Sequence, residues 1–236
     1  MASSAMFGCL VTATDTGVGK TVLSGALAAA LRAQGLSVAA FKPVLTGADE
    51  PPGQWPADDE LLASVTGQAP EQVCPSRLGP AVSPHLAAAL AGTVIEPASL
   101  LRAARQAGRD RDALVVEGVG GLLVPLTPEY LVRDFAGALG LPLVIAARPG
   151  LGTINHTLLT VEAARSAQLT VSAVVLTPWP AQPDAMLESN RATIARLGEV
   201  EVATLGPIAA RTPEALAAAG AQLEARGWMG SDRAQL

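Results

Sequence analysis

The chain has 236 residues, half of them hydrophobic and 16% charged, which fits one large α/β domain or two small ones. Its net charge of −5 excludes the basic surface that binding to nucleic acid or to an anionic membrane would require. The first residues lack a signal-peptide pattern, and every apolar run is interrupted before it reaches membrane-spanning length. We therefore expect a cytoplasmic protein.

Short runs rich in Val, Ile and Leu alternate with longer segments rich in Ala and Leu. The short runs predict strands at 7–12, 37–42, 113–117, 143–147, 171–176 and 202–205. The longer segments predict helices at 20–34, 59–66, 84–91, 97–107, 131–139, 155–167, 184–197 and 213–225. Strands that are apolar throughout indicate a sheet covered on both faces, and the alternation with helices indicates parallel, doubly wound strands. A ligand would then bind beyond the carboxyl ends of the strands.

A glycine-rich loop, Thr-Asp-Thr-Gly-Val-Gly-Lys-Thr at residues 14–21, joins the first strand to the first helix. Its glycines let backbone N–H groups turn toward phosphate oxygens, and the helix start adds partial positive charge. Lys20 is placed to reach the β- and γ-phosphates, and the Thr21 hydroxyl can ligate Mg²⁺. Thr14 stands where the usual pattern has glycine, but the last three positions match.

This loop predicts a single P-loop NTPase-type domain over residues 1–236, with helices on both faces of a mainly parallel sheet. Residues 230–236 are expected to form a flexible tail.

Two charged residues end strands beside this loop. The position of Lys42 at the end of the second strand leaves open a solvated charge or a catalytic or substrate-binding role. Glu117 ends the third strand and is followed by the glycine-rich residues 118–121. A carboxylate there is typical of a Mg²⁺ contact in P-loop enzymes.

Asp58 and Asp59 lie at the start of a predicted helix, where either could cap the helix or supply a further oxygen ligand. We predict a magnesium site formed by Thr21, Asp59 and Glu117, although the sequence barely separates Asp59 from Asp58.

Two segments without a regular hydrophobic pattern are also candidates for a functional role. The turn at 150–156 follows a strand and opens a helix, so its free N–H groups form a second potential anion site. Residues 45–56, centred on Pro51-Pro52-Gly53, are interpreted as a mobile surface loop that could act as a lid.

Taken together, these motifs resemble the dethiobiotin synthetases. The resemblance extends from Val11 to about Pro207 and is specific in the order and combination of its elements. These are residues 14–21, Lys42-Pro43-Val44 with Thr46-Gly47, Ser83-Pro84-His85, residues 116–121 and residues 151–156.

The resemblance implies ATP- and Mg²⁺-dependent closure of the ureido ring of dethiobiotin from 7,8-diaminononanoate and CO₂. The reaction would pass through a carbamate and a carbamic–phosphoric anhydride and release ADP and phosphate. It also implies a homodimer whose active site lies at the subunit interface, with the 150–155 turn of one chain contacting the substrate carboxylate in the other.

The same resemblance implies roles for individual residues. Lys42 and Lys20 would be catalytic, and Thr21, Asp59 and Glu117 would hold Mg²⁺. The nucleotide would contact Thr16, Gly17, Val18, Gly19, Lys20, Thr21, Val22, Asp59, Glu117, Gly118, Val119, Gly120, Thr177 and Pro207. The diamine substrate would contact Thr14, Thr46, Leu151, Gly152, Thr153 and Asn155.

The chain departs from the family pattern at two positions. Ala13 replaces a common glycine, and because alanine tolerates positive φ poorly we predict strand-like dihedrals there. Thr177 stands where the family often has an asparagine that reads adenine, and threonine cannot make the paired amide contacts. We therefore hypothesise weak base selection.

Two other functions share such a loop. Partitioning or switch-type ATPases, which act through protein partners, carry a second lysine early in the loop, where this chain has Asp15. Cobyrinate-type amidating enzymes need a nucleophilic cysteine in a glutaminase domain, and neither Cys9 nor Cys74 lies in such a setting.

Overall fold

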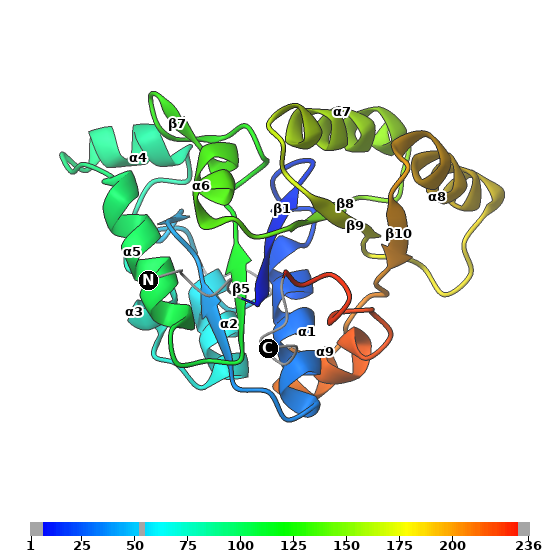
Figure 1. The fold of residues 1–236 in the computed structure, drawn as a ribbon, viewed down its shortest axis with the longest axis horizontal. Helices are drawn as coiled ribbons and strands as arrows, with labels where there is room; N and C mark the ends of the chain where they lie inside the picture. The colour runs from blue at the N-terminus through cyan, green and yellow to red at the C-terminus, as the bar shows by residue number, and fades with distance from the viewer. Residues whose placement is uncertain (1–6, 52–54, 231–236) are drawn as a thin grey trace.

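Six parallel strands form the central sheet of the computed structural model, which describes residues 7–51 and 55–230 (Figure 1). The spatial order is β10-β9-β8-β1-β5-β2, with β1 between strands that come later in the chain. The strands are β1 (Gly8–Ala13), β2 (Val38–Phe41), β5 (Ala113–Glu117), β8 (Leu143–Ala147), β9 (Val171–Leu176) and β10 (Glu201–Thr204). The predicted fold class is confirmed.

Helices cover both faces of this sheet. One core cluster joins the sheet to α1, α2 and α9, and two others join it to α4–α8. Figure 1 shows α7 and α8 together on the side opposite α1 and α9. The helices are α1 (Lys20–Ala33), α2 (Asp58–Thr66), α3 (Pro70–Val73), α4 (Pro84–Leu90), α5 (Pro97–Gly108), α6 (Val132–Leu139), α7 (Thr153–Ser166), α8 (Ala185–Gly198) and α9 (Pro213–Gly220).

Two small ribbons lie outside the central sheet. β3 (Leu45–Thr46) pairs in parallel with β4 (Arg77–Leu78), and β6 (Pro125–Thr127) pairs antiparallel with β7 (Tyr130–Leu131). Within the described part of the chain, no helix is both long and apolar enough to cross a membrane.

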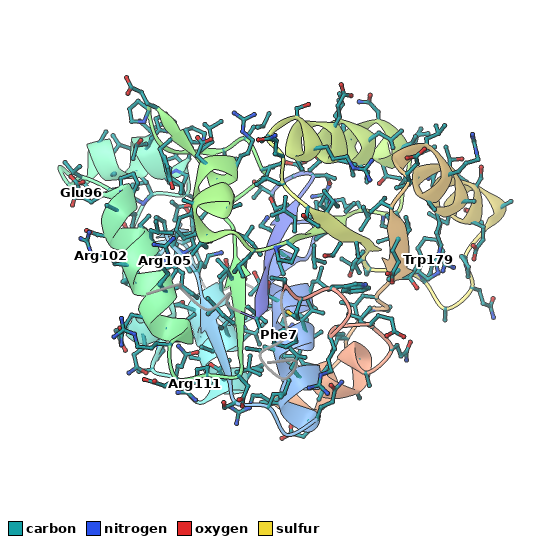
Figure 2. The ribbon with its side chains drawn as sticks, in the orientation of Figure 1. Phe7, Glu96, Arg102, Arg105, Arg111 and Trp179 are labelled. Atoms are coloured by element: carbon teal, nitrogen blue, oxygen red, sulfur yellow. The ribbon has the colours of Figure 1, made fainter. Side chains whose placement is uncertain are left out.

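Strand β1 is buried along its whole length and contributes side chains to the core on both faces of the sheet. Cys9 and Val11 pack on the side of α1, whereas Leu10 packs on the side of α5 and α6. Because this strand is buried along its whole length and its side chains alternate between the two faces, both faces need helical cover. Burial raises the pKa of the Cys9 thiol to about 12, so this side chain acts as a small apolar group. Beside β10, Trp179 joins the cluster beneath α7 and α8 (Figure 2).

Ala13 ends β1 without positive φ, which confirms its predicted strand geometry. Other segments differ from prediction. The helix expected over 213–225 ends at Gly220, and the helix expected from residue 155 begins at Thr153. Gly230, placed in the predicted tail, donates its N–H to the carbonyl of Gly8 at 2.8 Å; residues 231–236 lie outside the described residues.

The irregular segment 45–56 begins with the short strand β3, in which Leu45 is buried. This strand was not predicted, because two residues show no periodicity. Pro52 and Gly53, at the centre of the predicted lid, lie outside the described residues.

Helix α9 packs closely on α1 through Gly220, where a Cβ atom would overlap the carbonyl oxygen of Ala26. We expect Gly220→Ala to lower the free energy of unfolding by about 1–3 kcal/mol, because backbone cannot move aside as a side chain can. Urea unfolding measures the change. Gly137→Ala in α6 is the control: its Cβ would meet Leu169 at an ordinary 3.5 Å, so helix propensity should make it neutral or slightly stabilising. Equal effects of the two substitutions would contradict the close contact.

Candidate active site

The loop between β1 and α1 depends on two glycines in left-handed conformations, Gly17 with φ 69° and Gly19 with φ 100°. Side chains other than glycine rarely adopt these angles. Gly19 is also the N-cap of α1, so the free N–H groups of the helix start face the same space as the loop. Lys20 is the first helical residue, buried, and its Nζ donates to the carbonyl of Asp15 at 3.3 Å.

Lys42 lies at the centre of the site, where its ammonium is shared between two carboxylates. Its Nζ is 2.7 Å from Oδ2 of Asp58 and 2.7 Å from Oε1 of Glu117. The hydroxyl of Thr21 lies 2.7 Å from Oδ1 of Asp58 and 3.0 Å from Oε1 of Glu117. Four segments thus meet here: the ends of β2 and β5, the start of α2 and the phosphate loop. The predicted placement of Lys42 and Glu117 beside the loop is confirmed.

The charges of this network support one another. Burial alone would lower the pKa of Lys42, but the carboxylates of Glu117 and Asp58 outweigh it and raise the pKa above its usual value. Burial alone would raise the pKa of Asp58, but Lys42 lowers it overall. Burial raises the pKa of Glu117 and lowers that of Lys20. Lys42 is therefore held as a cation at neutral pH.

Asp59, the predicted magnesium ligand, faces away from this network. Its side chain is fully buried and forms an ion pair with Arg77 of β4. Asp58 occupies the place beside Thr21 that the sequence assigned to Asp59. The difference is geometric, because consecutive helical residues point about 100° apart. The assignment of Asp59 to the group around Thr21 was therefore wrong.

The oxygens of Thr21, Asp58 and Glu117 fit a hard divalent cation. Oε2 of Glu117 is buried and has no hydrogen-bond partner among the described residues, so it is free to bind a metal ion. Over the same residues, no group of three or more His, Cys, Asp or Glu side chains could hold a metal. Two carboxylates suffice for Mg²⁺, which keeps several waters and takes other oxygens from phosphate.

A cavity of about 740 Å³ opens over this network. The sequence-predicted residues that line it are Thr16, Gly17, Gly19, Lys20, Thr21, Val22, Lys42, Thr46, Glu117, Val119 and Gly120. The cavity is also lined by Trp55 and Pro56, which end the segment predicted as a lid, and by Leu61, Ala81, Val82 and Val124, which belong to no motif predicted from the sequence.

The remaining predicted residues lie elsewhere. Val18 is buried in the core, and Gly118 donates its N–H to the carbonyl of Val11 at 2.8 Å. Thr177, after β9, is buried beside Gly19, and Pro207, after β10, is exposed.

The 151–155 turn does not line the main cavity of its own chain. Leu151 is 93% exposed, Gly152 and Asn155 are exposed, and Thr153 is buried against Thr157. Thr14 lines a second cavity of about 380 Å³.

The parallel sheet, the glycine loop at its centre and the paired lysines define a P-loop nucleotide-binding protein. A family described as "AAA domain" matches residues 8–212. The ATP-dependent dethiobiotin synthetase BioD of Anaeromyxobacter dehalogenans (strain 2CP-1 / ATCC BAA-258) is 44% identical over 86% of this chain and 90% of its own length. The corresponding protein of Mycobacterium sp. (strain JLS) is 40% identical over the same shares. The chain belongs to the dethiobiotin synthetase family.

Solved structures with the same fold include more distant proteins. The cell division ATPase MinD of Pyrococcus furiosus aligns with a TM-score of 0.56 at 18% identity, over 94% of this chain and 98% of its own. A ParA family ATPase of Chlorobium tepidum aligns with a TM-score of 0.54 at 13% identity, over 93% and 92%. At this identity the likeness establishes the fold alone.

We expect the Asp59–Arg77 pair to stabilise the fold. Arg77→Met leaves a buried carboxylate without its partner and should lower the free energy of unfolding by about 1–3 kcal/mol. The control is Arg133→Met, because Arg133 is 3.8 Å from Asp134 in a partly exposed pair and should contribute well under about 1 kcal/mol. Urea unfolding compares the two variants. Indistinguishable losses would mean that the pair adds nothing specific.

Proposed function

We propose that this enzyme closes the ureido ring of dethiobiotin from 7,8-diaminononanoate, CO₂ and ATP. The observation that carries the proposal is the 44% identity to a dethiobiotin synthetase over nearly its whole length. One amine captures CO₂ as a carbamate, and a carbamate oxygen attacks the γ-phosphorus as ADP leaves. The second amine then attacks the carbonyl carbon of the mixed anhydride, closing the ring and expelling phosphate.

The two lysines suit this chemistry because a carbamate and a triphosphate are both anions and repel each other. Lys42 lies beside Thr21 and would hold the carbamate near the γ-phosphate, while Lys20 would contact the phosphates from the loop. Cations fixed before the reaction begins stabilise the developing charge without reorganisation. Thr46 lines the same cavity and would contact the substrate. Holding both reactants in one geometry supplies much of the remaining acceleration.

Mg²⁺ would be held by Thr21, Asp58 and Glu117, whose oxygens already converge. When bound, it supplies positive charge to the phosphate oxygens and the leaving group.

The active site would be completed by a second copy of the chain. The 151–155 turn is well exposed in one chain and lies outside its main cavity, yet it begins a helix whose N–H groups favour an anion. We propose that it contacts the substrate carboxylate in the partner of a homodimer.

A switch-type ATPase is the alternative function. Its fold is shared, as the similarity to MinD and ParA structures indicates, but the sequence identity there is 18% or less. Asp15 occupies the position of the second lysine that such proteins carry. Besides ATP and Mg²⁺, the synthetase needs only a diamine and bicarbonate, whereas a switch needs a macromolecular partner.

The proposed activity is tested by mixing the protein with 7,8-diaminononanoate, labelled bicarbonate, Mg²⁺ and ATP and following label into a cyclic urea. Lys42→Ala should reduce product formation by about 10²–10³-fold or more, because it removes a positive charge from the transition state. ATP affinity, measured by calorimetry, should change far less and reports that the loop is still folded. Full turnover by Lys42→Ala would refute the role of this lysine.

The reassignment of the metal ligand yields a second test. Asp58→Asn should raise the Mg²⁺ concentration needed for half-maximal activity by about tenfold or more, since one anionic ligand is lost. Asp59→Asn is the matched control, because Asp59 faces Arg77, and should leave that concentration nearly unchanged while lowering the melting temperature. The reverse pattern would restore Asp59 as the ligand.

A further inference from the structure

Trp55 is the one tryptophan that lines the main cavity within residues 7–51 and 55–230. Trp179 and Trp228 are 9% and 2% exposed and belong to the core. Trp55 lies just before α2 and is only partly buried, and like Val22 it packs against the core cluster on the α1 side of the sheet. A large aromatic ring therefore lines the cavity that also holds the phosphate loop and Val22 of α1.

Arg211, which is distant from Trp55 in the sequence, contacts the ring of Trp55. Its guanidinium carbon is 5.3 Å from the centroid of the Trp55 ring, a cation–π distance. Arg211 is exposed, lies between β10 and α9 four residues after Pro207, and forms no ion pair within the described parts of the chain. Two residues distant in sequence, Trp55 and Arg211, are thereby brought together, and Trp55 lines the cavity.

The end of β9 offers little for recognition of a nucleobase. Thr177 carries a hydroxyl and a methyl group but no amide, and it is only 3% exposed. Its methyl carbon lies 3.1 Å from the position that a Cβ on Gly19 would take, so it is packed against the phosphate loop. A base held near this strand would find little hydrogen-bonding specificity there.

Given the nucleotide-dependent function above, we propose that Trp55 and Arg211 form a stacking platform for the nucleobase. An aromatic face and a guanidinium plane both bind the π-face that every base presents, so such a platform is tolerant of base identity. A nucleotide anchored by its terminal phosphates at Lys20 and Thr21 would extend its ribose past Val22, which lines the same cavity as Trp55. Trp55 would thus supply affinity that Thr177 does not.

The test measures dissociation constants by calorimetry with Mg²⁺ and without diamine, for ATP, CTP, GTP and inorganic triphosphate. Trp55→Ala should weaken all three nucleotides by about tenfold, within the range of one lost base–aromatic stack. The affinity for inorganic triphosphate, which has no base, should stay unchanged. Trp55→Phe should retain most of the nucleotide affinity because it keeps an aromatic face.

Arg211→Ala should weaken the nucleotides in the same pattern but by a smaller factor. Arg102→Ala is the matched control, because Arg102 lies on α5 (Figure 2), donates a hydrogen bond to Ser99 and does not line the main cavity. It should leave all four constants unchanged.

Three results would overturn the proposal: unchanged nucleotide affinity in Trp55→Ala, an equal loss for inorganic triphosphate, or a wild-type preference for ATP above about a hundredfold. An equal loss would mean that Trp55 only supports the fold around the loop. None of these results bears on the synthetase reaction, whose own failure would be the absence of labelled cyclic urea from wild-type protein.

Discussion

A single buried ammonium determines how the parts of this site fit together. Lys42 leaves the end of β2 and reaches both Glu117, at the end of β5, and Asp58, at the start of α2. A buried charge without partners is strongly unfavourable, and the two carboxylates offset the cost of burying this ammonium. Because Thr21 contacts the same two carboxylates, the phosphate loop is fixed to the ion-pair network in the same arrangement. Asp58 joins the start of α2 to this network and to the loop.

The network also has a charge balance suited to anionic ligands. Two ammonium groups, Lys20 and Lys42, face two carboxylates, so the ligand-free site is close to neutral. The carboxylates that neutralise Lys42 are the ones proposed to bind Mg²⁺. A metal ion at Thr21, Asp58 and Glu117 would take over part of that negative charge and leave more of the Lys42 charge for substrate oxygens. The same charged residues can thus neutralise one another without Mg²⁺ and attract an anionic substrate once Mg²⁺ is bound.

The elements that could be predicted from the sequence are those with a clear local hydrophobic pattern. The strands 113–117, 143–147 and 171–176 were placed to the residue, because each is a buried apolar run with clear boundaries. Strands β3, β4 and β7 have two residues each and show no periodicity, so they were not predicted.

The error at Asp59 follows from those missed strands. The partner of Asp59 is Arg77, which lies in β4, and without that strand nothing in the sequence distinguishes Asp59 from Asp58. Lys42 and Glu117 were placed correctly because the carboxyl ends of adjacent parallel strands must meet at one edge of the sheet. The place of Trp55 in the cavity was not predicted, because this residue lies in an irregular segment whose position is set by tertiary contacts alone.

The end of β8 shows how one strand can serve two sites. Just after the strand, Arg148 donates from Nη2 to the carbonyl of Thr16 at 3.2 Å and so braces the phosphate loop of its own chain. Three residues later Leu151 is almost fully exposed, and the turn it begins does not line that chain's main cavity. If the turn binds substrate in a partner, as proposed, the segment 148–155 would tie the loop of one protomer to the substrate of the other. A dimer would then be required by the geometry of the reaction rather than by stability alone.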